Sequence, residues 1–446
     1  MIVEQGKKLC EKAFWLLLLA SPLLDMINGI WTYLRCGGDG GMLSSLDIKD
    51  IPGMSPSFLL RVAFLLVMAV YVLLCRNWRA VGMFAAIGVT WCGTVAYEHF
   101  RGAEFSLRAD VQYIVRFCYC LLVLVVYFTM LKGGDGPVCK RRVDQVLCLS
   151  LLVLGLGVLI PYILGMGFFT YADPLGYRGS RGFFYAGNDI TAVMMLLLPV
   201  VLAGWMGREK GAAGRAGWLQ AVSAGLGFVA LLIIGTKTAF LAAGVTLAVL
   251  AGYSLLRGLR ARSWTSGLRL LTVLAIVLAV LCLMMLICET SPITTIWKSL
   301  SATSRYIEIA DTETVIFSGR TSYLDQALAQ FRQALPVSAL VGIGRGSQGH
   351  IIEMDPVEVL VYYGLLGALT MLWLYVLQGV RVIIDLFRAF RLEALACAVS
   401  LGLCASYCVL AGHVLFSVTA GFYFAFMIAY ARAFCSKDGR DKTTLL

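Results

Sequence analysis

The sequence predicts an all-α, polytopic integral membrane protein, and three observations lead to this fold class. Of the 446 residues, 60% are hydrophobic and only 14% are charged, which is too little charge for the surface of a soluble protein. The mean hydropathy is +0.83. Apolar runs of about 20 residues, the length that crosses a hydrocarbon core of about 30 Å, recur along the chain. Such long runs exclude the short alternating strands of a membrane β-barrel.

Hydropathy predicts about 12 transmembrane helices. In chain order they lie near residues 14–34, 58–75, 80–97, 111–131, 146–169, 190–206, 217–234, 238–256, 268–288, 357–384, 394–412 and 414–434. We divide the chain into helices one to nine (1–288), a long connection that carries part of the site (289–356), and helices ten to twelve with a short tail (357–446).

The charge distribution predicts the orientation of these helices. When the N-terminus is assigned to the cytoplasm, most of the Lys and Arg residues fall on that side, beginning with Lys7, Lys8 and Lys12. Cytoplasmic loops carry such an excess. The net charge of +11 is therefore a topology signal and not a sign of nucleic-acid binding. Both termini are expected in the cytoplasm, and the first helix is expected to be retained, because no small-residue cleavage site follows it.

The sequence lacks the signatures of soluble enzymes and of metal sites. It has no P-loop, no G-x-G-x-x-G in a βαβ context, no H-E-x-x-H and no G-x-S-x-G. The 14 cysteines form no C-x-x-C pair and mostly lie in apolar runs, where they serve as small packing residues. Three histidines cannot form a zinc site without other ligands. We therefore expect neither a metal nor a cofactor.

The connection 289–356 is expected on the outer face, and long connections are usually functional or disordered. Residues from Thr321 to Leu335 form an amphipathic pattern, with Leu324, Leu328 and Phe331 on the apolar stripe. This pattern predicts a short helix on the membrane surface. A solvated helix with no role beyond loop packing is the alternative.

The first candidate group of charges precedes the sixth helix. Arg178 and Arg181 lie three residues apart on a Gly-rich segment, and Asn188 is a candidate cap of that helix. A guanidinium group donates two parallel hydrogen bonds, which suits phosphate. Either the two arginines bind an anion, or they anchor the loop to lipid headgroups.

The second candidate is Lys237, the single charge in a tight turn between two apolar helices. A turn this short holds the ammonium group near membrane depth, where a charge is costly. Lys237 is expected to face an anion in a cavity, and the alternative is that it extends to the headgroups.

The third group lies along the connection 289–356. Its charged members are Arg320, Arg345, His350, Glu353 and Asp355, and its glycines are Gly319, Gly342 and Gly344. Asp355 directly precedes Pro356, so it is expected to cap the tenth helix. Glu353 lies further out and is the candidate general base.

The order of these motifs resembles the O-antigen ligase and polysaccharide polymerase superfamily of bacterial membrane glycosyltransferases. The similarity covers roughly residues 178–367. The matching residues are Arg178, Arg181 and Asn188, then Thr236 to Thr238 with Lys237 in place of Arg, then Ser318 to Arg320 with Tyr323, then Gly342 and Gly344, and finally Gly364 and Gly367. Glu353 occupies the position where many members have His, and His350 lies three residues too early. The base role is therefore transferred to Glu353 before His350.

The resemblance implies a GT-C-like helical protein of the bacterial cytoplasmic membrane, with an extracytoplasmic active site. Its substrates would be a polyprenyl (undecaprenyl) diphosphate-linked glycan and an acceptor glycan, and the expected reaction is polymerisation of surface polysaccharide repeats. Arg181, Lys237 and Arg320 would contact the diphosphate, with Arg178 and Arg345 in support. Ligation of a finished glycan to a lipid, protein or wall acceptor is the first alternative.

A twelve-helix transporter or a flippase is the alternative from another class. Transporters of this size often contain two repeated halves. Here the long connection follows the ninth helix and not the sixth, so no such repeat is apparent. Charges that lie scattered along the bundle would favour transport, whereas charges that meet at one face favour the transferase.

Overall fold

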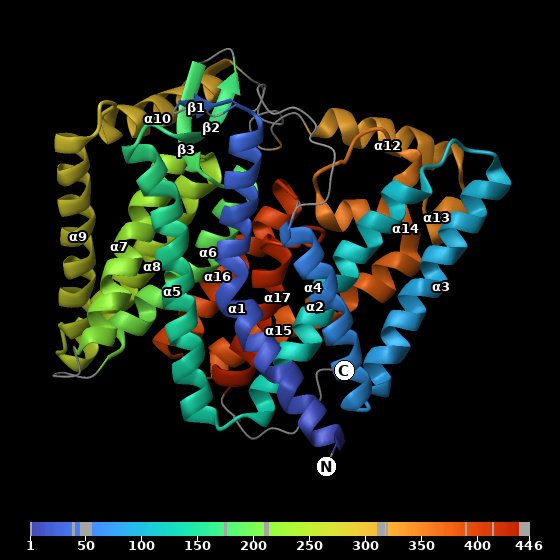
Figure 1. The fold of residues 1–446 in the computed structure, drawn as a ribbon, viewed down its shortest axis with the longest axis horizontal. Coiled ribbons are helices and arrows are strands. Elements are labelled where there is room, and N and C mark those ends of the chain that lie inside the picture. Colours follow the sequence, from blue (N-terminus) through green and yellow to red (C-terminus); the bar gives the residue numbers. More distant parts are fainter. Residues whose placement is uncertain are drawn as a thin grey trace.

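The computed structural model describes residues 2–37, 41–44, 56–173, 176–208, 214–309, 317, 320–388, 390–412 and 414–436. The protein is a bundle of long helices with a small sheet and several short helices at one end (Figure 1). The predicted all-α membrane fold is confirmed. Among the described residues, ten helices are long and apolar enough to cross a membrane, and two shorter apolar helices lie at Leu59–Leu74 and Ala420–Phe434. The number of twelve spans stays a prediction.

Each predicted hydrophobic range corresponds to a long helix or to a run of consecutive helices. These are α1 (Ile2–Arg35), α2 (Pro56–Leu74), α3 (Trp78–Arg101), α4 (Leu107–Gly133), α5 (Gly136–Ile163), α6 (Gly187–Met206), α7 (Arg215–Ile234), α8 (Lys237–Ala261), α9 (Thr265–Ile287), α14 (Asp355–Gly367) with η2 (Ala368–Leu372) and α15 (Trp373–Arg388), α16 (Leu392–Leu410) and α17 (Ala420–Phe434). Local sequence sets several ends. The Asn77 side chain caps α3 by accepting from the Ala80 amide, and Gly102 closes the helix in the left-handed region.

The sequence analysis placed the end of the fifth helix wrongly and missed a sheet. The helix ends at Ile163 rather than at residue 169, and the chain continues into β2 (Gly167–Asp173) and β3 (Gly176–Gly182). These strands pair antiparallel, and β1 (Met42–Leu43) joins β2 in parallel. Apolar residues 166–169 continue the hydropathy of the helix, so hydropathy alone could not separate strand from span.

The long connection contains more helix than predicted. The expected amphipathic helix is present as α12 (Thr321–Gln333). Two further helices, α10 (Pro292–Ile309) and α13 (Val337–Val341), and a 3-10 turn η1 (Arg345–Ser347) were not predicted. In Figure 1 these elements lie at the same end as the sheet, opposite the beginning of α1. We call this end the loop end.

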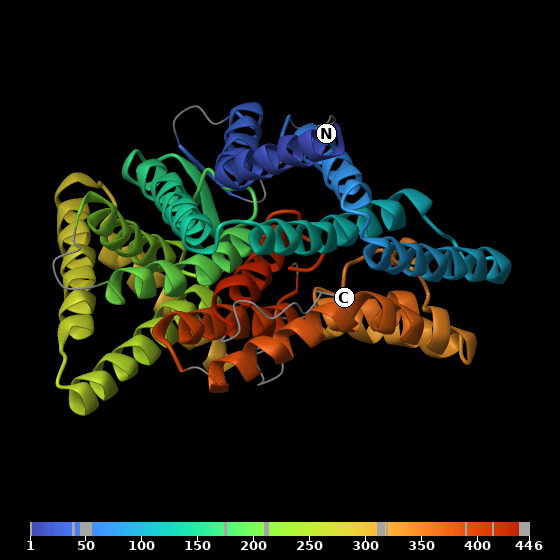
Figure 2. The same ribbon diagram turned by 90° about the horizontal axis from the view of Figure 1, so that it is seen from below.

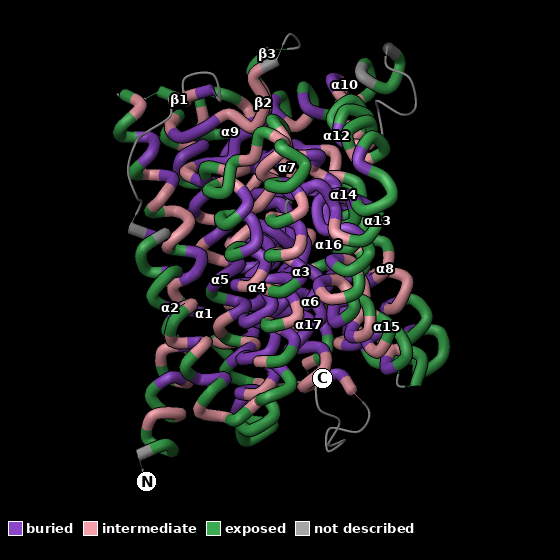
Figure 3. Tube along the Cα trace, turned by 90° about the vertical axis from the view of Figure 1, so that its right-hand side faces the viewer, coloured by how far each residue is buried: buried purple, intermediate pink, exposed green. Residues whose placement is uncertain are grey.

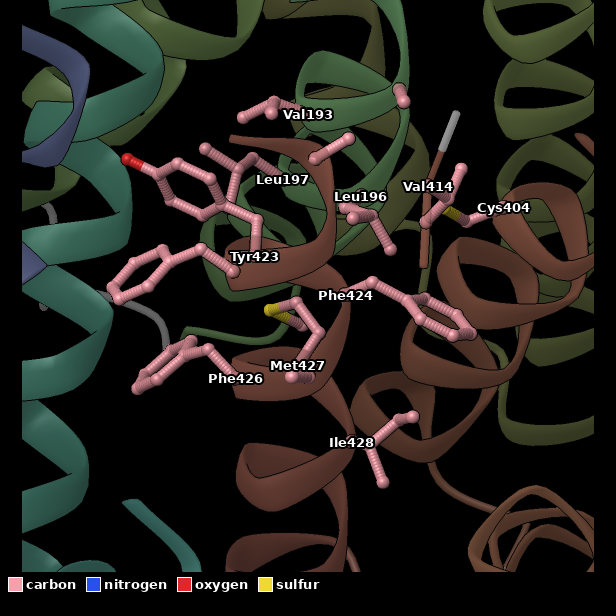
Figure 4. Close-up of a cluster of buried hydrophobic side chains, with 14 of the residues drawn as sticks. Val193, Leu196, Leu197, Cys404, Val414, Tyr423, Phe424, Phe426, Met427 and Ile428 are labelled. Atoms are coloured by element: carbon pink, nitrogen blue, oxygen red, sulfur yellow. The ribbon is translucent and has the colours of Figure 1, made fainter. Parts of the chain in front are cut away.

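Burial separates central from peripheral helices. α17 packs against α4 and α6. In Figure 4 its residues Phe424 and Met427 lie toward Leu196 of α6 and Tyr423 lies near Leu197, whereas Phe426 points the other way and packs on the ring of Tyr127 in α4. Seen along the bundle, the C-terminal helix lies near the middle of the molecule (Figure 2). Exposed residues lie mostly on the outer helices (Figure 3), and on α9 these include Leu271, Leu278 and Leu286. Such apolar exposure suits contact with lipid chains.

Candidate active site

Three of the sequence-predicted cations meet at the loop end. Arg178 belongs to β3, Lys237 is the first residue of α8, and Arg320 directly precedes α12. The positive charges of Arg178 and Arg320 both act on the ammonium group of Lys237. We call these three residues the cation cluster. Like charges repel, so a cluster of this kind is stabilised by a bound anion.

Glu353 pairs with this cluster through Arg320. The Nε and Nη2 atoms of Arg320 donate to the same carboxylate oxygen, Oε2 of Glu353, at 2.8 and 2.7 Å. The Arg320 side chain is 13% exposed and that of Glu353 is 31% exposed. The predicted base is therefore held beside the predicted anion-binding groups and is open on one side.

The backbone of Glu353 adopts a conformation that L-residues rarely adopt, with φ of 64°. Its amide donates to Oε1 of the buried carboxylate of Glu358. A Cβ on Gly412, which lies between α16 and α17, would come within 2.3 Å of the Glu353 carbonyl carbon. The surrounding chain thus holds a left-handed residue in place, and such strain is concentrated at functional sites.

Arg181 lies on the same strand as Arg178 but in a buried setting. It is 8% exposed, its guanidinium carbon lies 5.4 Å from the Phe168 ring centroid, and its Nε has no hydrogen-bond partner among the described residues. Burial lowers the pKa of Arg181 to about 10, so it remains a cation at neutral pH. A buried guanidinium whose Nε has no partner among the described residues is suited to bind an anion.

The strand that carries Arg181 is wedged between α1 and α5. A Cβ on Gly29 of α1 would lie 1.4 Å from the Phe183 carbonyl oxygen, and one on Gly182 would lie 2.1 Å from the Gly157 carbonyl oxygen. Gly182 also has a φ of 57°. Only glycine fits these positions, which bring the backbone of residues 182–183 against both helices.

Arg181 lines a cavity of about 700 Å³, which we call the central cavity. Its charged lining residues are Asp25, Arg61, Arg116, Arg181 and Asp189. Tyr171 and Thr236 also line it. The guanidinium of Arg178 lies 4.8 Å from the Tyr171 ring centroid, and Thr236 precedes Lys237. The cation cluster therefore adjoins the cavity.

The sequence analysis did not single out Asp25, Arg61 or Arg116. Arg61 donates to Oδ1 of Asp25 and to Oγ1 of Thr419. All three charged residues interrupt apolar stretches of predicted spans, and an ionisable residue within a span is a functional candidate by default. That signal was present in the sequence and could have identified them.

The remaining predicted residues make contacts that the sequence did not predict. The amide of Arg345 donates to Oδ1 of Asp110 on α4 at 2.7 Å, and the ring of His350 stacks on that of Tyr323 with centroids 4.9 Å apart. Gly342, Gly344 and Gly364 have positive φ, and a Cβ on Gly342 or Gly364 would meet the backbone of the facing segment. Gly342 and Gly364 thus allow α13 and α14 to pack closely. Gly319 lies outside the described residues.

The two predicted helix caps differ in the structure. The N-cap of α6 is Ala186, and Asn188 lies within the first turn and lines the central cavity. Asp355 is the first residue of α14 and does not cap it; the N-cap is Met354. The buried carboxylate of Asp355 instead accepts from the amides of Val414 and Leu415, both at 2.8 Å. The Asp355 carboxylate thus has tertiary partners that local sequence rules do not predict, whereas Asn188 faces the cavity.

Within the described part of the chain, no three His, Cys, Asp or Glu residues are grouped as metal ligands. A family model described as "O-antigen ligase like membrane protein" matches residues 7–309 and 298–434 of the chain. No curated protein matches it.

Proposed function

The chain belongs to the O-antigen ligase-like membrane protein family and acts in glycan transfer at the membrane, and we propose that it is a glycosyltransferase whose donor is a polyprenyl diphosphate-linked glycan. The acceptor is a sugar hydroxyl on the outer face of the bacterial cytoplasmic membrane. The proposed product is a lengthened surface polysaccharide that remains lipid-linked.

The observation that carries this proposal is the meeting of the cation cluster with Glu353. Four residues that lie far apart in the sequence supply three positive charges and one carboxylate. Arg178 and Lys237 lie next to Tyr171 and Thr236, which line a cavity of about 700 Å³. A volume of this size is typical of ligand sites. Scattered charges would have favoured transport instead.

The cations suit the leaving group. When the bond between the anomeric carbon and the diphosphate oxygen breaks, its electron pair leaves with the diphosphate and negative charge develops there. Fixed cations aimed at this charge stabilise the transition state, and removing one such donor usually costs about 10²–10³ in rate. Arg181, Lys237 and Arg320 would provide this stabilisation, supported by Arg178. Arg345, whose amide donates to Asp110 and whose guanidinium donates to the Gln348 carbonyl, stays a second-line candidate for the same contact.

Glu353 would act on the acceptor. It takes the proton of the attacking hydroxyl while the acceptor oxygen forms a bond to the anomeric carbon. In the structure two Arg320 nitrogens donate to Oε2 of Glu353. A diphosphate that draws Arg320 toward itself would free Oε2 of Glu353 to accept the proton of the acceptor hydroxyl.

The test is incubation of purified protein with a polyprenyl diphosphate-linked oligosaccharide, followed by chromatography of the lipid-linked products. Lengthened lipid-linked glycan is the expected result. Transfer only to a separate lipid, protein or wall acceptor would establish the ligase alternative. Movement of the lipid across proteoliposomes without any new glycosidic bond would overturn the transferase proposal.

A further inference from the structure

The central cavity has a polar wall that the proposed chemistry leaves unused. It consists of Asp25 and Asn28 on α1, Arg61 on α2, Arg116 on α4 and Thr419 at the start of α17. We call these five residues the α1–α2 wall. They come from four separate segments, so the tertiary fold and not the local sequence brings them together. Arg116 lies about 13 Å along α4 from its first residue, Leu107.

Asp25 has one satisfied and one unsatisfied oxygen. Oδ1 accepts from Arg61 and, at 2.8 Å, from the Thr419 hydroxyl. Oδ2 is buried and has no hydrogen-bond partner among the described residues. A buried carboxylate oxygen without a donor is unfavourable. This oxygen therefore calls for an O–H or N–H group that the described protein does not supply.

Asn28 and Arg116 add further unused hydrogen-bonding groups. Within the described ranges, neither side chain forms a hydrogen bond or an ion pair, and both line the cavity. An amide offers two donors and an acceptor, and a guanidinium offers five donors. The wall thus presents acceptors and donors together, whereas a site built for a simple anion would not include the Asp25 carboxylate.

Aromatic rings complete the lining. Tyr171, Phe184, Tyr185 and Phe416 line the same cavity, and Tyr185 is 49% exposed. A sugar ring offers hydroxyls that both donate and accept, and apolar C–H faces that pack on aromatic rings. Mixed planar polar groups beside aromatic rings match that chemistry better than they match a lipid tail.

We propose that the α1–α2 wall binds the sugar ring that is bonded directly to the lipid diphosphate, and that Asp25 recognises a hydroxyl or N-acetyl N–H of this ring. The inference rests on the proposed function, because Arg181 in the same cavity would hold the adjoining diphosphate. The α1–α2 wall would then determine which sugar binds, while the cations would bind only the diphosphate.

The experiment uses microscale thermophoresis to compare the binding of two kinds of ligand to the purified full chain. One is farnesyl diphosphate, and the other is farnesyl diphosphate bonded to glucose, galactose or N-acetylglucosamine. In the wild type, at least one sugar is expected to tighten binding about tenfold or more over farnesyl diphosphate. Asp25→Asn and Asn28→Ala are expected to remove most of this gain and to bind farnesyl diphosphate as the wild type does. Gln112→Ala, an exposed polar change on α4, is the matched control and keeps the gain.

The outcomes separate the two proposals. If no sugar tightens binding, or if both wall variants keep the gain, the wall does not bind sugar and this inference is wrong. In that case the loss of farnesyl diphosphate binding in Arg181→Met still supports the proposed function. If the wild type binds none of the ligands, the proposed function and this inference both fall. Asn28→Ala breaks no described side-chain contact, so it remains informative even if Asp25→Asn does not fold.

Discussion

At the scale of single residues, Glu353 is the group on which the proposed chemistry depends. Glu353→Gln keeps the shape but removes the proton acceptor. We expect kcat for glycan transfer to fall by about 10²–10⁴, with binding of farnesyl diphosphate retained because the cations are unchanged. The measurement is transfer to the acceptor with lipid-linked donor in excess.

The matched control is Glu308→Gln on the exposed face of α10, which is expected to leave kcat unchanged. Wild-type turnover in Glu353→Gln would mean that this carboxylate does not take the acceptor proton. His350 would then be the next residue to replace.

Arg181 carries a second residue-scale prediction, which concerns stability as well as function. Its pKa in the folded protein, about 10, lies below its ordinary value. The buried charge therefore opposes folding at any pH below about 10, and this penalty disappears as the pH rises between the two values. Arg181→Met at pH 7 is expected to keep or raise Tm and to lower the transfer rate by about 10²–10³.

Thermal unfolding in detergent and the transfer assay measure the two effects separately. A large fall in Tm for Arg181→Met would show that the guanidinium contributes to folding, and the loss of activity could then not be assigned to anion binding.

At the scale of elements, the contact between α1 and Phe183, the residue after β3, sets the position of Arg181. Gly29→Ala places a methyl group 1.4 Å from the Phe183 carbonyl oxygen, so the segment after β3 must move. Alanine is otherwise the better helix former by about 1 kcal/mol. We expect Gly29→Ala to lose transfer activity at least tenfold, since a misplacement of about 1 Å can cost 10²-fold.

Gly88→Ala is the matched control, because a Cβ at Gly88 in α3 meets nothing within 4 Å. It is expected to keep full activity with an equal or higher Tm. Equal activities of the two variants would mean that the wedge between α1 and β3 does not position the site.

Asp355, the first residue of α14, is expected to stabilise the fold, whereas Glu353 is expected to act in the chemistry. Because Asp355 holds the turn before α17 through two amides and the Cys408 thiol, Asp355→Ala is expected to lower the free energy of unfolding by about 3 kcal/mol. Asp325→Ala, on the exposed side of α12, should change it by less than about 0.5 kcal/mol. Differential scanning fluorimetry compares the two, and equal Tm values would contradict this role.

The sequence predicted the elements that hydropathy defines and missed those that depend on pairing. Each apolar run appears as helix, and α12 was predicted from its amphipathic pattern. The three-stranded sheet was not predicted, because β1 pairs with β2 across a separation of more than 100 residues, and no local signal encodes such a contact. α10 was not predicted, because its sequence is not hydrophobic enough to resemble a transmembrane helix.

The same limit applies to the site. The residue types and their order along the chain predicted the cations and Glu353, but not the pairing of Arg320 with Glu353. The pair of Arg61 with Asp25 was not predicted although both charges interrupt apolar runs, because no local pattern shows which charges in separate spans meet. The roles of Asn188 and Asp355 were assigned from local capping rules, whereas Asp355 bonds to residues near 414 and Asn188 faces a cavity.

At the scale of the whole molecule, the loop end is predicted to face away from the cytoplasm. In a chain with Cys36 and Cys288 replaced by Ser, Ala329→Cys on α12 should react with a membrane-impermeant maleimide on intact cells. Asp135→Cys, in the turn before α5, should react only after the membrane is permeabilised. The opposite pattern would place the cation cluster on the cytoplasmic side and overturn the proposed function.

The contacts of Asp25 and Arg61 with Thr419 connect positions close to the two ends of the polypeptide. A ribosome makes α1 and α2 long before it makes α17, so the wall of the cavity stays incomplete until α17 has been made. A chain that stops early, or that is cut before α17, inserts most of its helices yet lacks the Thr419 side of the central cavity. On the proposed function, nascent and broken copies in the membrane lack a complete sugar-binding wall and are expected not to use the lipid-linked donor.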